Sequence, residues 1–219
     1  MQSIVRNSLA MQPRVTSQAQ VVLLGGPSGA GKTRLADRTG LPIVRLDNFY
    51  REGDDPALPR TAAGLVDWDD PRSWDGAAAV AALTELCITG AAELPVYDIA
   101  HDGVVGAQRV VLAGARLVVA EGIFAAEIIA GSRERGLLAA ALCVRQNRFV
   151  TWWRRLVRDV RERRKPVPVL IRRGLHLLRV EPAVIERQVR QGAACVSPAE
   201  GRELIARLAG DRLPGASPT

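Results

Sequence analysis

The chain has 219 residues, enough for one α/β domain with a full core, and its 47% of hydrophobic residues excludes a disordered chain. No apolar run reaches the roughly 18 residues that a membrane span needs, and three widely spaced cysteines without a CxxC pair argue against a zinc or redox motif. The net charge of +7 suits either a nucleic acid partner or a site built for polyphosphate.

The N-terminal part of the chain predicts a leader, a strand, a helix and a second strand. Residues 1–19 are polar and lack the apolar core of a secretory signal, so we expect a partly ordered leader on a cytoplasmic protein. Residues 20–24 are a short apolar run that ends in two glycines, which is typical of a buried parallel strand. A helix should start near Gly31 and run through Arg38, and residues 43–46 predict a second strand.

The middle of the chain predicts a long loop, a helix and a hairpin. Residues 48–72 are rich in Asp, Pro and Gly, and loops of this length are usually functional. Residues 75–89 predict a helix that stops at Gly90. Residues 94–98 and 108–112 predict the strands of a small β-hairpin flap.

The second half of the chain alternates buried strands with helices. Strands are expected at residues 116–121, 139–145 and 193–196, and helices at residues 149–164, 169–191 and 198–209. This alternation implies βαβ units and a parallel sheet. We therefore predict a single α/β domain over residues 20–209, with a helical lid at about 149–180 and a flexible tail at 210–219.

A glycine-rich segment between the first strand and the first helix matches the phosphate-binding pattern GxxxxGK[ST] in full. Its residues are Gly26, Pro27, Ser28, Gly29, Ala30, Gly31, Lys32 and Thr33. Glycines let backbone N–H groups turn toward phosphate oxygens, Lys32 reaches the β- and γ-phosphates, and the Thr33 hydroxyl is a hard ligand for Mg²⁺. A chance glycine-rich turn is the alternative, but the flanking elements argue against it. The pattern predicts a three-layer P-loop NTPase fold that binds ATP or GTP with Mg²⁺.

Two carboxylates come at the ends of predicted strands. Asp47 follows the strand at 43–46, and Glu121 ends the strand at 116–121. Ligands of open parallel sheets bind at this edge. Asp47 could accept the proton of an attacking hydroxyl or hold a Mg²⁺-bound water, and Glu121 suits a metal-water ligand. A capping role for Asp47 and a solvent-exposed strand end for Glu121 are the alternatives.

Two further segments are candidates for binding an acceptor molecule. Asp69 lies in an acidic and aromatic stretch, where carboxylates can hold vicinal sugar hydroxyls; a turn with Asx caps explains the stretch equally well. Tyr97 and His101 come close together near the end of the first hairpin strand. They could contact a base or a sugar, or belong to an ordinary hairpin edge.

The predicted helix at 149–164 is dense in arginine. Helical spacing puts Arg158 on its main basic face, whereas Arg155 and Arg163 lie off that line. Arginine suits bidentate phosphate contacts, and a cationic lid would stabilise the charge of a transferring phosphoryl group. A solvated basic face or a nucleic acid patch is the alternative.

Taken in order, these motifs resemble the uridine kinase family of P-loop nucleoside kinases, which is related to phosphoribulokinase and pantothenate kinase. Six segments within residues 21–165 carry the resemblance, namely GGPSGAGKT, RLDNFY, VDWDDPRSWD, LPVYDIAH, VVAEGIF and RRLVRDVRERR. The resemblance implies ATP-dependent or GTP-dependent phosphorylation of a nucleoside 5′-hydroxyl.

The resemblance also implies a role for each candidate residue. Asp47 would activate the hydroxyl, and Asp69 would bind the ribose hydroxyls. Tyr97 and His101 would face the base, and Thr33 and Glu121 would serve Mg²⁺. The lid residues Arg155, Arg158 and Arg163 would meet the phosphates or the acceptor.

The acceptor motifs depart from the family pattern. The family usually has Asp-His-Pro where this chain has Asp69-Asp70-Pro71, and His101 comes one residue earlier after Tyr97 than family spacing predicts. The leading hypothesis is a kinase of a nucleoside, with uridine or cytidine first. One alternative changes the acceptor to another nucleoside, a pantothenate-like molecule or a sugar. The other is a non-catalytic NTP-binding module with a basic docking helix.

The expected partners are therefore a nucleoside triphosphate and a small-molecule acceptor. We expect neither a membrane nor a nucleic acid partner, and we consider a homo-oligomer because related kinases are often oligomers. Lys32 is expected in a solvated loop, so its replacement should abolish transfer without unfolding the protein.

Overall fold

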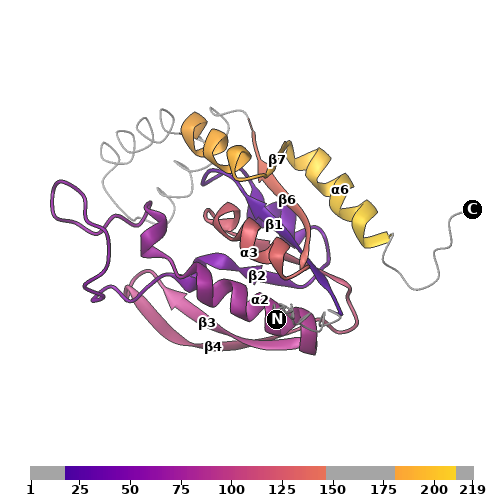
Figure 1. Ribbon diagram of the computed structural model, residues 1–219, viewed down its shortest axis with the longest axis horizontal. Helices are drawn as coiled ribbons and strands as arrows, with labels where there is room; N and C mark the ends of the chain where they lie inside the picture. The colour runs from indigo at the N-terminus through magenta and orange to yellow at the C-terminus, as the bar shows by residue number, and fades with distance from the viewer. Residues whose placement is uncertain (1–17, 147–180, 211–219) are drawn as a thin grey trace, which may run out of the picture.

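The computed structural model describes residues 18–146 and 181–210 (Figure 1). Its strands are β1 (Gln20–Gly25), β2 (Ile43–Arg45), β3 (Ala91–Asp98), β4 (Gly103–Val111), β5 (Leu117–Glu121), β6 (Leu138–Val144) and β7 (Ala194–Val196). Its helices are α1 (Lys32–Asp37), α2 (Gly76–Thr89), α3 (Ile129–Glu134) and α6 (Pro198–Gly210), and residues 181–190 are also helical. Short 3₁₀ helices are η1 (Leu46–Phe49), η2 (Pro71–Ser73) and η3 (Ala125–Ile128).

A five-stranded parallel sheet in the order β2-β5-β1-β6-β7 forms the centre of the molecule. β3 and β4 pair separately as an antiparallel hairpin, which lies beside α2 in Figure 1. The chain places β2 and β5 on one side of β1 and β6 and β7 on the other. The strand order therefore reverses at β1, and a ligand crevice is expected outside the carboxyl end of this strand.

The two faces of β1 belong to two separate layers of the core. Val21 and Leu23 pack in a cluster with α2 and α3, whereas Val22 and Leu24 pack in a cluster with α1 and α6. All four side chains are buried, because successive residues of a central strand point to opposite covered faces. The predicted three-layer α/β fold with a parallel sheet is confirmed.

Helix α2 shows why its boundaries were predictable. The Asp75 side chain accepts a hydrogen bond from the Ala78 N–H at 2.9 Å, which satisfies one of the free donors of the first turn. Gly90 ends the helix in the left-handed conformation, with φ of 86°. Leu83 and Leu86 point into the core between these two caps.

Two expectations about local structure need correction. The pattern predicted no element between the end of β5 and the start of β6, yet η3 and α3 lie there and contribute Ile128 and Ile129 to the core. β3 and β4 are also longer than predicted, because β3 begins at Ala91, directly after the cap of α2. The long loop at 48–72 is confirmed, apart from short 3₁₀ turns and isolated bridges at its ends and middle.

The described part of the chain has definite limits. The leader, lid and tail predictions fall mainly on residues 1–17, 147–180 and 211–219, which lie outside it, as do Arg155, Arg158 and Arg163. Ala19, the last residue of the predicted leader, is buried in the core. Within the described ranges, no helix combines the length and apolar character needed to cross a membrane.

Candidate active site

The glycine-rich loop joins the carboxyl end of β1 to α1, at the point where the strand order reverses. Gly26 has φ of 128°, and a Cβ atom at this position would lie 2.4 Å from the Val144 carbonyl oxygen. Gly29 and Gly31 also have positive φ, at 82° and 94°. Three positive φ values in such a short segment favour glycine, which has no Cβ atom. The resulting curl of the loop points successive backbone N–H groups inward.

Lys32 is the first residue of α1 and lies against this loop. Its Nζ atom donates hydrogen bonds to the carbonyl oxygens of Gly26 and Pro27 at 3.0 and 3.2 Å. The residue is only 7% exposed, so the expectation of a solvated position is wrong. The ammonium group thus lies against the loop carbonyls rather than in open solvent.

Glu121 ends β5 in the middle of the sheet edge, opposite Leu24 of β1 and Arg45 of β2. Its Oε1 atom accepts hydrogen bonds from the Thr33 hydroxyl at 3.1 Å and from the Arg45 guanidinium at 3.2 Å. Burial raises the pKa of Glu121, and nearby Lys32 opposes that rise. The side chain is 6% exposed, so a solvent-exposed strand end is excluded.

Asp47 lies in η1, directly after β2, and reaches the end of β5. A Cβ atom at Gly122 would lie 2.9 Å from the Asp47 Oδ1 atom, so only glycine allows this approach. The Asp47 carboxylate accepts a hydrogen bond from the Ile123 backbone, which places it across the sheet edge rather than as a cap of its own helix. Burial in the recess raises the pKa of Asp47, and Lys32 partly offsets the rise. The Asp47 side chain also keeps contact with solvent.

The resulting arrangement fits Mg²⁺ bound together with phosphate. The Thr33 hydroxyl and the Glu121 carboxylate provide two hard oxygen groups side by side, with Asp47 near enough to raise the pKa of Glu121. Residues 18–146 and 181–210 contain no group of three or more His, Cys, Asp or Glu side chains that could form a protein cage for a metal. Mg²⁺ usually takes one or two protein ligands plus water and phosphate oxygens, so two groups suffice.

An aromatic cluster lies within electrostatic reach of Asp47. The ring of Tyr50 lies 5.6 Å from Trp68 and 5.7 Å from Tyr97, and Trp68 lies 6.4 Å from Tyr97. These residues come from three segments: the end of η1, the long loop and β3. Burial raises the pKa of Tyr50, with further contributions from the charges of Asp47 and Asp69. Both carboxylates therefore lie within electrostatic reach of Tyr50.

Tyr97 is part of this cluster, and its hydroxyl is buried without a hydrogen-bond partner among the described residues. Burial raises the pKa of Tyr97 to about 12. The Tyr97 N–H donates to the Asn48 Oδ1 atom at 3.3 Å, which ties β3 to η1. His101 lies in the exposed hairpin turn, where its Nδ1 atom is 2.6 Å from Asp98 Oδ2.

Comparison with known proteins agrees with this geometry. The model of the phosphoribulokinase/uridine kinase family matches residues 21–172. The chain belongs to this family. As a family member it is a P-loop kinase, and family membership supports a phosphotransferase that uses a nucleotide and a small molecule.

Individual relatives show modest similarity to this family member. A uridine kinase of Clostridium botulinum (strain Kyoto / Type A2) is 26% identical over 178 residues, covering 74% of this chain and 83% of the relative. The uridine kinase of Saccharomyces cerevisiae is 29% identical over 147 residues, which cover 64% of this chain and only 29% of the yeast protein. A solved structure of a candidate fructose transport system kinase from Silicibacter sp. TM1040 has a TM-score of 0.58 at 19% identity. It covers 86% of this chain and 91% of its own, and it supports the fold alone.

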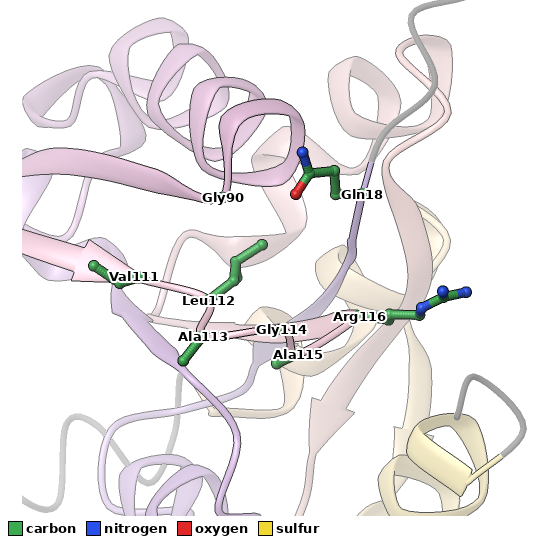
Figure 2. Close-up of a pocket in the computed structure, with 8 residues that line it drawn as sticks. All are labelled: Gln18, Gly90, Val111, Leu112, Ala113, Gly114, Ala115 and Arg116. Atoms are coloured by element: carbon green, nitrogen blue, oxygen red, sulfur yellow. The ribbon is translucent and has the colours of Figure 1, made fainter. Parts of the chain in front are cut away.

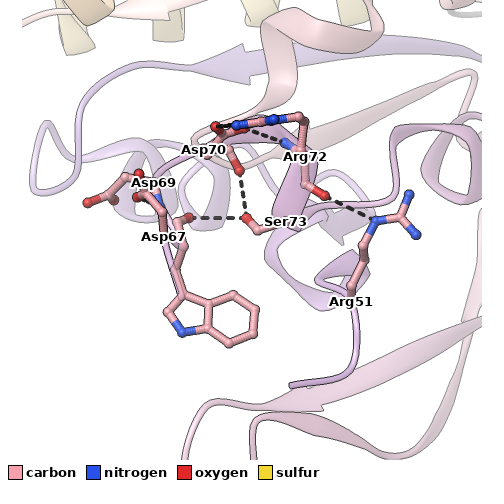
Figure 3. Close-up of polar contacts among 7 residues, drawn as sticks. Arg51, Asp67, Asp69, Asp70, Arg72 and Ser73 are labelled. Carbon is pink, nitrogen blue, oxygen red and sulfur yellow. Dashed lines mark hydrogen bonds and ion pairs between the residues drawn. The ribbon is translucent and has the colours of Figure 1, made fainter. Parts of the chain in front are cut away.

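The turn that carries Asp69 is where this family member departs most from the expected acceptor motif. Asp70 pairs with Arg72 at 2.7 Å and caps η2, and the hydrogen bonds from Arg72 lower the pKa of Asp70 to about 2. Asp67 accepts a hydrogen bond from the Asp69 N–H at 3.2 Å, so the predicted Asx turn is present. Figure 3 shows the Asp69 carboxylate extending away from the Asp70–Arg72 pair. Asp69 stays within electrostatic reach of Tyr50 in the aromatic cluster.

One hollow of the described residues lies at the opposite edge of the sheet. It measures about 620 Å³ and is lined by Gln18, Arg116 and the residues around Gly90 and Gly114 (Figure 2). These residues precede β1 and β5 or follow α2 and β4, so the hollow opens at the amino ends of the strands. Ligands of this sheet type bind at the carboxyl ends, and we assign no function to this hollow.

The sequence interpretation missed part of the site. Tyr50 ends the segment RLDNFY, and the sequence gives it no separate role. Its central place among the aromatic rings becomes visible once β3 and the long loop are packed together. Arg45 was not singled out either, although its position at the end of a predicted strand was a usable signal.

Proposed function

We propose that this protein transfers the γ-phosphoryl group of ATP or GTP to the 5′-hydroxyl of a nucleoside, with uridine and cytidine as the first candidates, in the cytoplasm. One observation carries the proposal: Asp47 lies within electrostatic reach of both the phosphate loop and the aromatic cluster. Its charge interacts with Lys32 and with Tyr50. A carboxylate in this position is suited to act on a hydroxyl group that is held beside a bound triphosphate.

The phosphate side of the site would hold the triphosphate in place. The N–H groups of the loop at 26–33 would bind phosphate oxygens, and Lys32 would offset the charge of the β- and γ-phosphates. Thr33 and Glu121 would hold Mg²⁺, which supplies further charge neutralisation for phosphoryl transfer when bound. The lid residues Arg155, Arg158 and Arg163 would complete the positive environment and exclude water.

The acceptor side would position the hydroxyl. Asp47 would accept its proton as the bond to phosphorus forms, while the rings of Tyr50, Trp68 and Tyr97 would pack against the base. Asp69 would accept hydrogen bonds from the ribose hydroxyls, and His101 would face the base from the hairpin turn. The Clostridium and yeast relatives are uridine kinases, which supports a nucleoside as the acceptor.

Two alternatives remain as outcomes of the test. The Asp70–Arg72 pair alters the acceptor motif, so another small molecule could replace the pyrimidine nucleoside. A non-catalytic NTP-binding module is the second alternative. Such a module has no need of a carboxylate in the recess beside Lys32, and the position of Asp47 therefore favours catalysis.

The test is an acceptor panel in a coupled assay for ADP or GDP release, with identification of the product. Uridine, cytidine, other nucleosides, ribose, fructose and pantothenate are compared at equal concentration. We expect release that depends on a pyrimidine nucleoside and yields its 5′-monophosphate. Turnover with a sugar or pantothenate alone would reassign the acceptor, and the absence of acceptor-dependent turnover across the panel would contradict the proposal.

A further inference from the structure

A second hollow adjoins the end of the phosphate loop, and Asp47 is not among the residues that line it. It measures about 390 Å³, within the range of roughly 300–1,000 Å³ typical of small-molecule sites. Its walls come from the end of the phosphate loop, from α1 and the residue that caps it, from Gln146 after β6 and from the start of α6. The lining residues are Gly31, Arg34, Leu35, Arg38, Gln146, Pro198, Ala199 and Arg202.

The packing of α6 on α1 brings three arginines to this hollow. A Cβ atom at Gly201 would lie 3.1 Å from the Leu35 side chain, so the glycine allows a close approach of the two helices. Arg202 then faces the same hollow as Arg34 and Arg38, which share a face of α1 at i,i+4 spacing. Like charges at this spacing destabilise a helix slightly.

These arginines lack acidic neighbours in the hollow. No carboxylate lines it, and within the ranges that the structure describes none of the three arginines makes an ion pair. Two acidic residues near these arginines along the chain are engaged elsewhere: Asp37 pairs with Arg45, and Glu200 accepts a hydrogen bond from the Ser197 N–H. Glu203, next to Arg202, does not line the hollow. The hollow therefore offers many hydrogen-bond donors and few acceptors. Even the Gly31 carbonyl already accepts from Leu35.

We infer that this hollow binds the base of the triphosphate donor and that its arginines select guanine over adenine. The inference rests on the proposed triphosphate site, because a nucleotide held by the loop can extend past Gly31 into the hollow. Guanine presents two acceptors, O6 and N7, on one edge, and a guanidinium group can bind both. Adenine presents N7 beside an N6 amino donor, which repels a second donor. A wall of arginines thus discriminates between the two bases, and GTP is the preferred donor.

The test measures nucleotide binding to the full chain with Mg²⁺ and without acceptor, by displacement of a fluorescent guanine nucleotide. GDP, IDP and ADP are compared, because IDP keeps O6 and N7 but lacks the 2-amino group. We expect GDP and IDP to bind about tenfold more tightly than ADP. Equal or tighter binding of ADP overturns the inference.

Variants of the hollow test the residues themselves. Arg34→Gln and Arg202→Gln should each bring the GDP-to-ADP affinity ratio towards one, while binding of inorganic tripolyphosphate changes little. Arg202→Lys should lose the preference as well, since lysine keeps the charge but not the planar fork. Arg207→Gln is the matched control, because Arg207 is an exposed residue of the same helix outside the hollow. An unchanged ratio in the folded hollow variants contradicts the assignment.

The outcomes for donor and acceptor can be separated. Preference for guanine nucleotides without acceptor-dependent transfer would support the hollow and contradict the proposed kinase activity. Acceptor-dependent transfer with a clear preference for ATP would support the proposed kinase activity and contradict the assignment of the hollow. If a variant fails to fold, as judged by its thermal unfolding, the order of GDP, IDP and ADP on the wild-type chain decides alone.

Discussion

Gly26 allows the phosphate loop to pack closely on the sheet because it has no side chain. Gly26 has a positive φ, and its hypothetical Cβ atom meets the backbone oxygen of Val144, which cannot rotate away. Gly40 also has a positive φ, of 69°, but has open space around it. An alanine at Gly40 would therefore test backbone strain alone, whereas an alanine at Gly26 would test strain together with the collision.

We predict that Gly26→Ala destabilises the protein by more than about 2 kcal/mol and lowers nucleotide affinity at least about tenfold, because strain and collision add. Gly40→Ala should cost about 1 kcal/mol of strain and leave affinity unchanged. Denaturant unfolding and nucleotide titration on both variants check this. Similar losses of affinity in the two variants would contradict the role of the contact with Val144.

We expect the ionised Asp47 carboxylate to lower the free energy of unfolding at neutral pH. Burial raises its pKa, so the folded state binds the proton more tightly than the unfolded state does. The stability contribution of this group is therefore favourable at low pH and is lost as pH rises through the ordinary value of 3.8 toward the raised folded value.

We therefore predict that Asp47→Asn raises the free energy of unfolding at pH 7, by less than about 1 kcal/mol because the side chain keeps solvent contact. The gain should shrink at pH 4, where the wild-type carboxyl becomes protonated. Denaturant unfolding at both pH values measures it, with Asp54→Asn, in the exposed loop, as the control. A variant that is less stable than wild type at pH 7 would refute this account of the recess.

At the scale of elements, the β3–β4 hairpin is docked onto the loop after η1. The Gly53 N–H donates to the Asp102 carbonyl at 2.6 Å, and the Val104 N–H donates to the Glu52 carboxylate at 3.3 Å. These contacts hold Tyr97 against Tyr50. The hairpin thus supplies one wall of the acceptor side, and its buried Tyr97 hydroxyl is the polar group of that wall without a partner among the described residues.

We predict that Tyr97→Phe leaves stability unchanged or raises it by up to about 1 kcal/mol, because removal of a buried, unsatisfied hydroxyl relieves a desolvation cost. The same change should raise KM for the acceptor, since the hydroxyl would hydrogen-bond to it. Tyr50→Phe is the matched control: its hydroxyl donates to the Trp68 carbonyl at 3.3 Å, so its loss should cost about 1 kcal/mol. Thermal unfolding and acceptor titrations check both variants, and a destabilised Tyr97→Phe would contradict this view.

The elements that could be predicted are those whose ends carry a local signal. Asp75 and Gly90 cap α2, and the glycine pattern after β1 announces both the loop and α1. α3 could not be predicted, because it has only six residues, includes Gly131 and depends on burial of Ile129 against other elements. Short helices of this kind are fixed by tertiary packing, which a local pattern does not contain.

The candidate site also has a part that the sequence could predict and a part that it could not. Asp47 and Glu121 could be placed at one sheet edge from the strand pattern, and the structure brings both to Lys32. The bond between Thr33 and Glu121 joins residues 88 positions apart, and the aromatic cluster joins three segments. Such contacts depend on the register and order of the strands, so the sequence could indicate their location but not their partners.

At the scale of the whole molecule, the reversal of strand order at β1 determines where the chemistry is. The carboxyl ends of β1, β2 and β5 meet there, so the phosphate loop, Asp47 and Glu121 share one edge. The hollow beside α1 and α6 adjoins the same loop, while Tyr50 of the aromatic cluster lies within electrostatic reach of Asp47. We therefore expect donor and acceptor to meet at Asp47.

The most direct test compares nucleotide binding and phosphoryl transfer in Asp47→Asn and the wild-type chain, in the same preparation and buffer. The amide cannot accept the hydroxyl proton, but it keeps the shape of the recess. We predict that nucleotide affinity stays close to that of wild type while acceptor-dependent release of the diphosphate falls by about 10²–10⁴-fold. Transfer at the wild-type rate in Asp47→Asn would contradict the account.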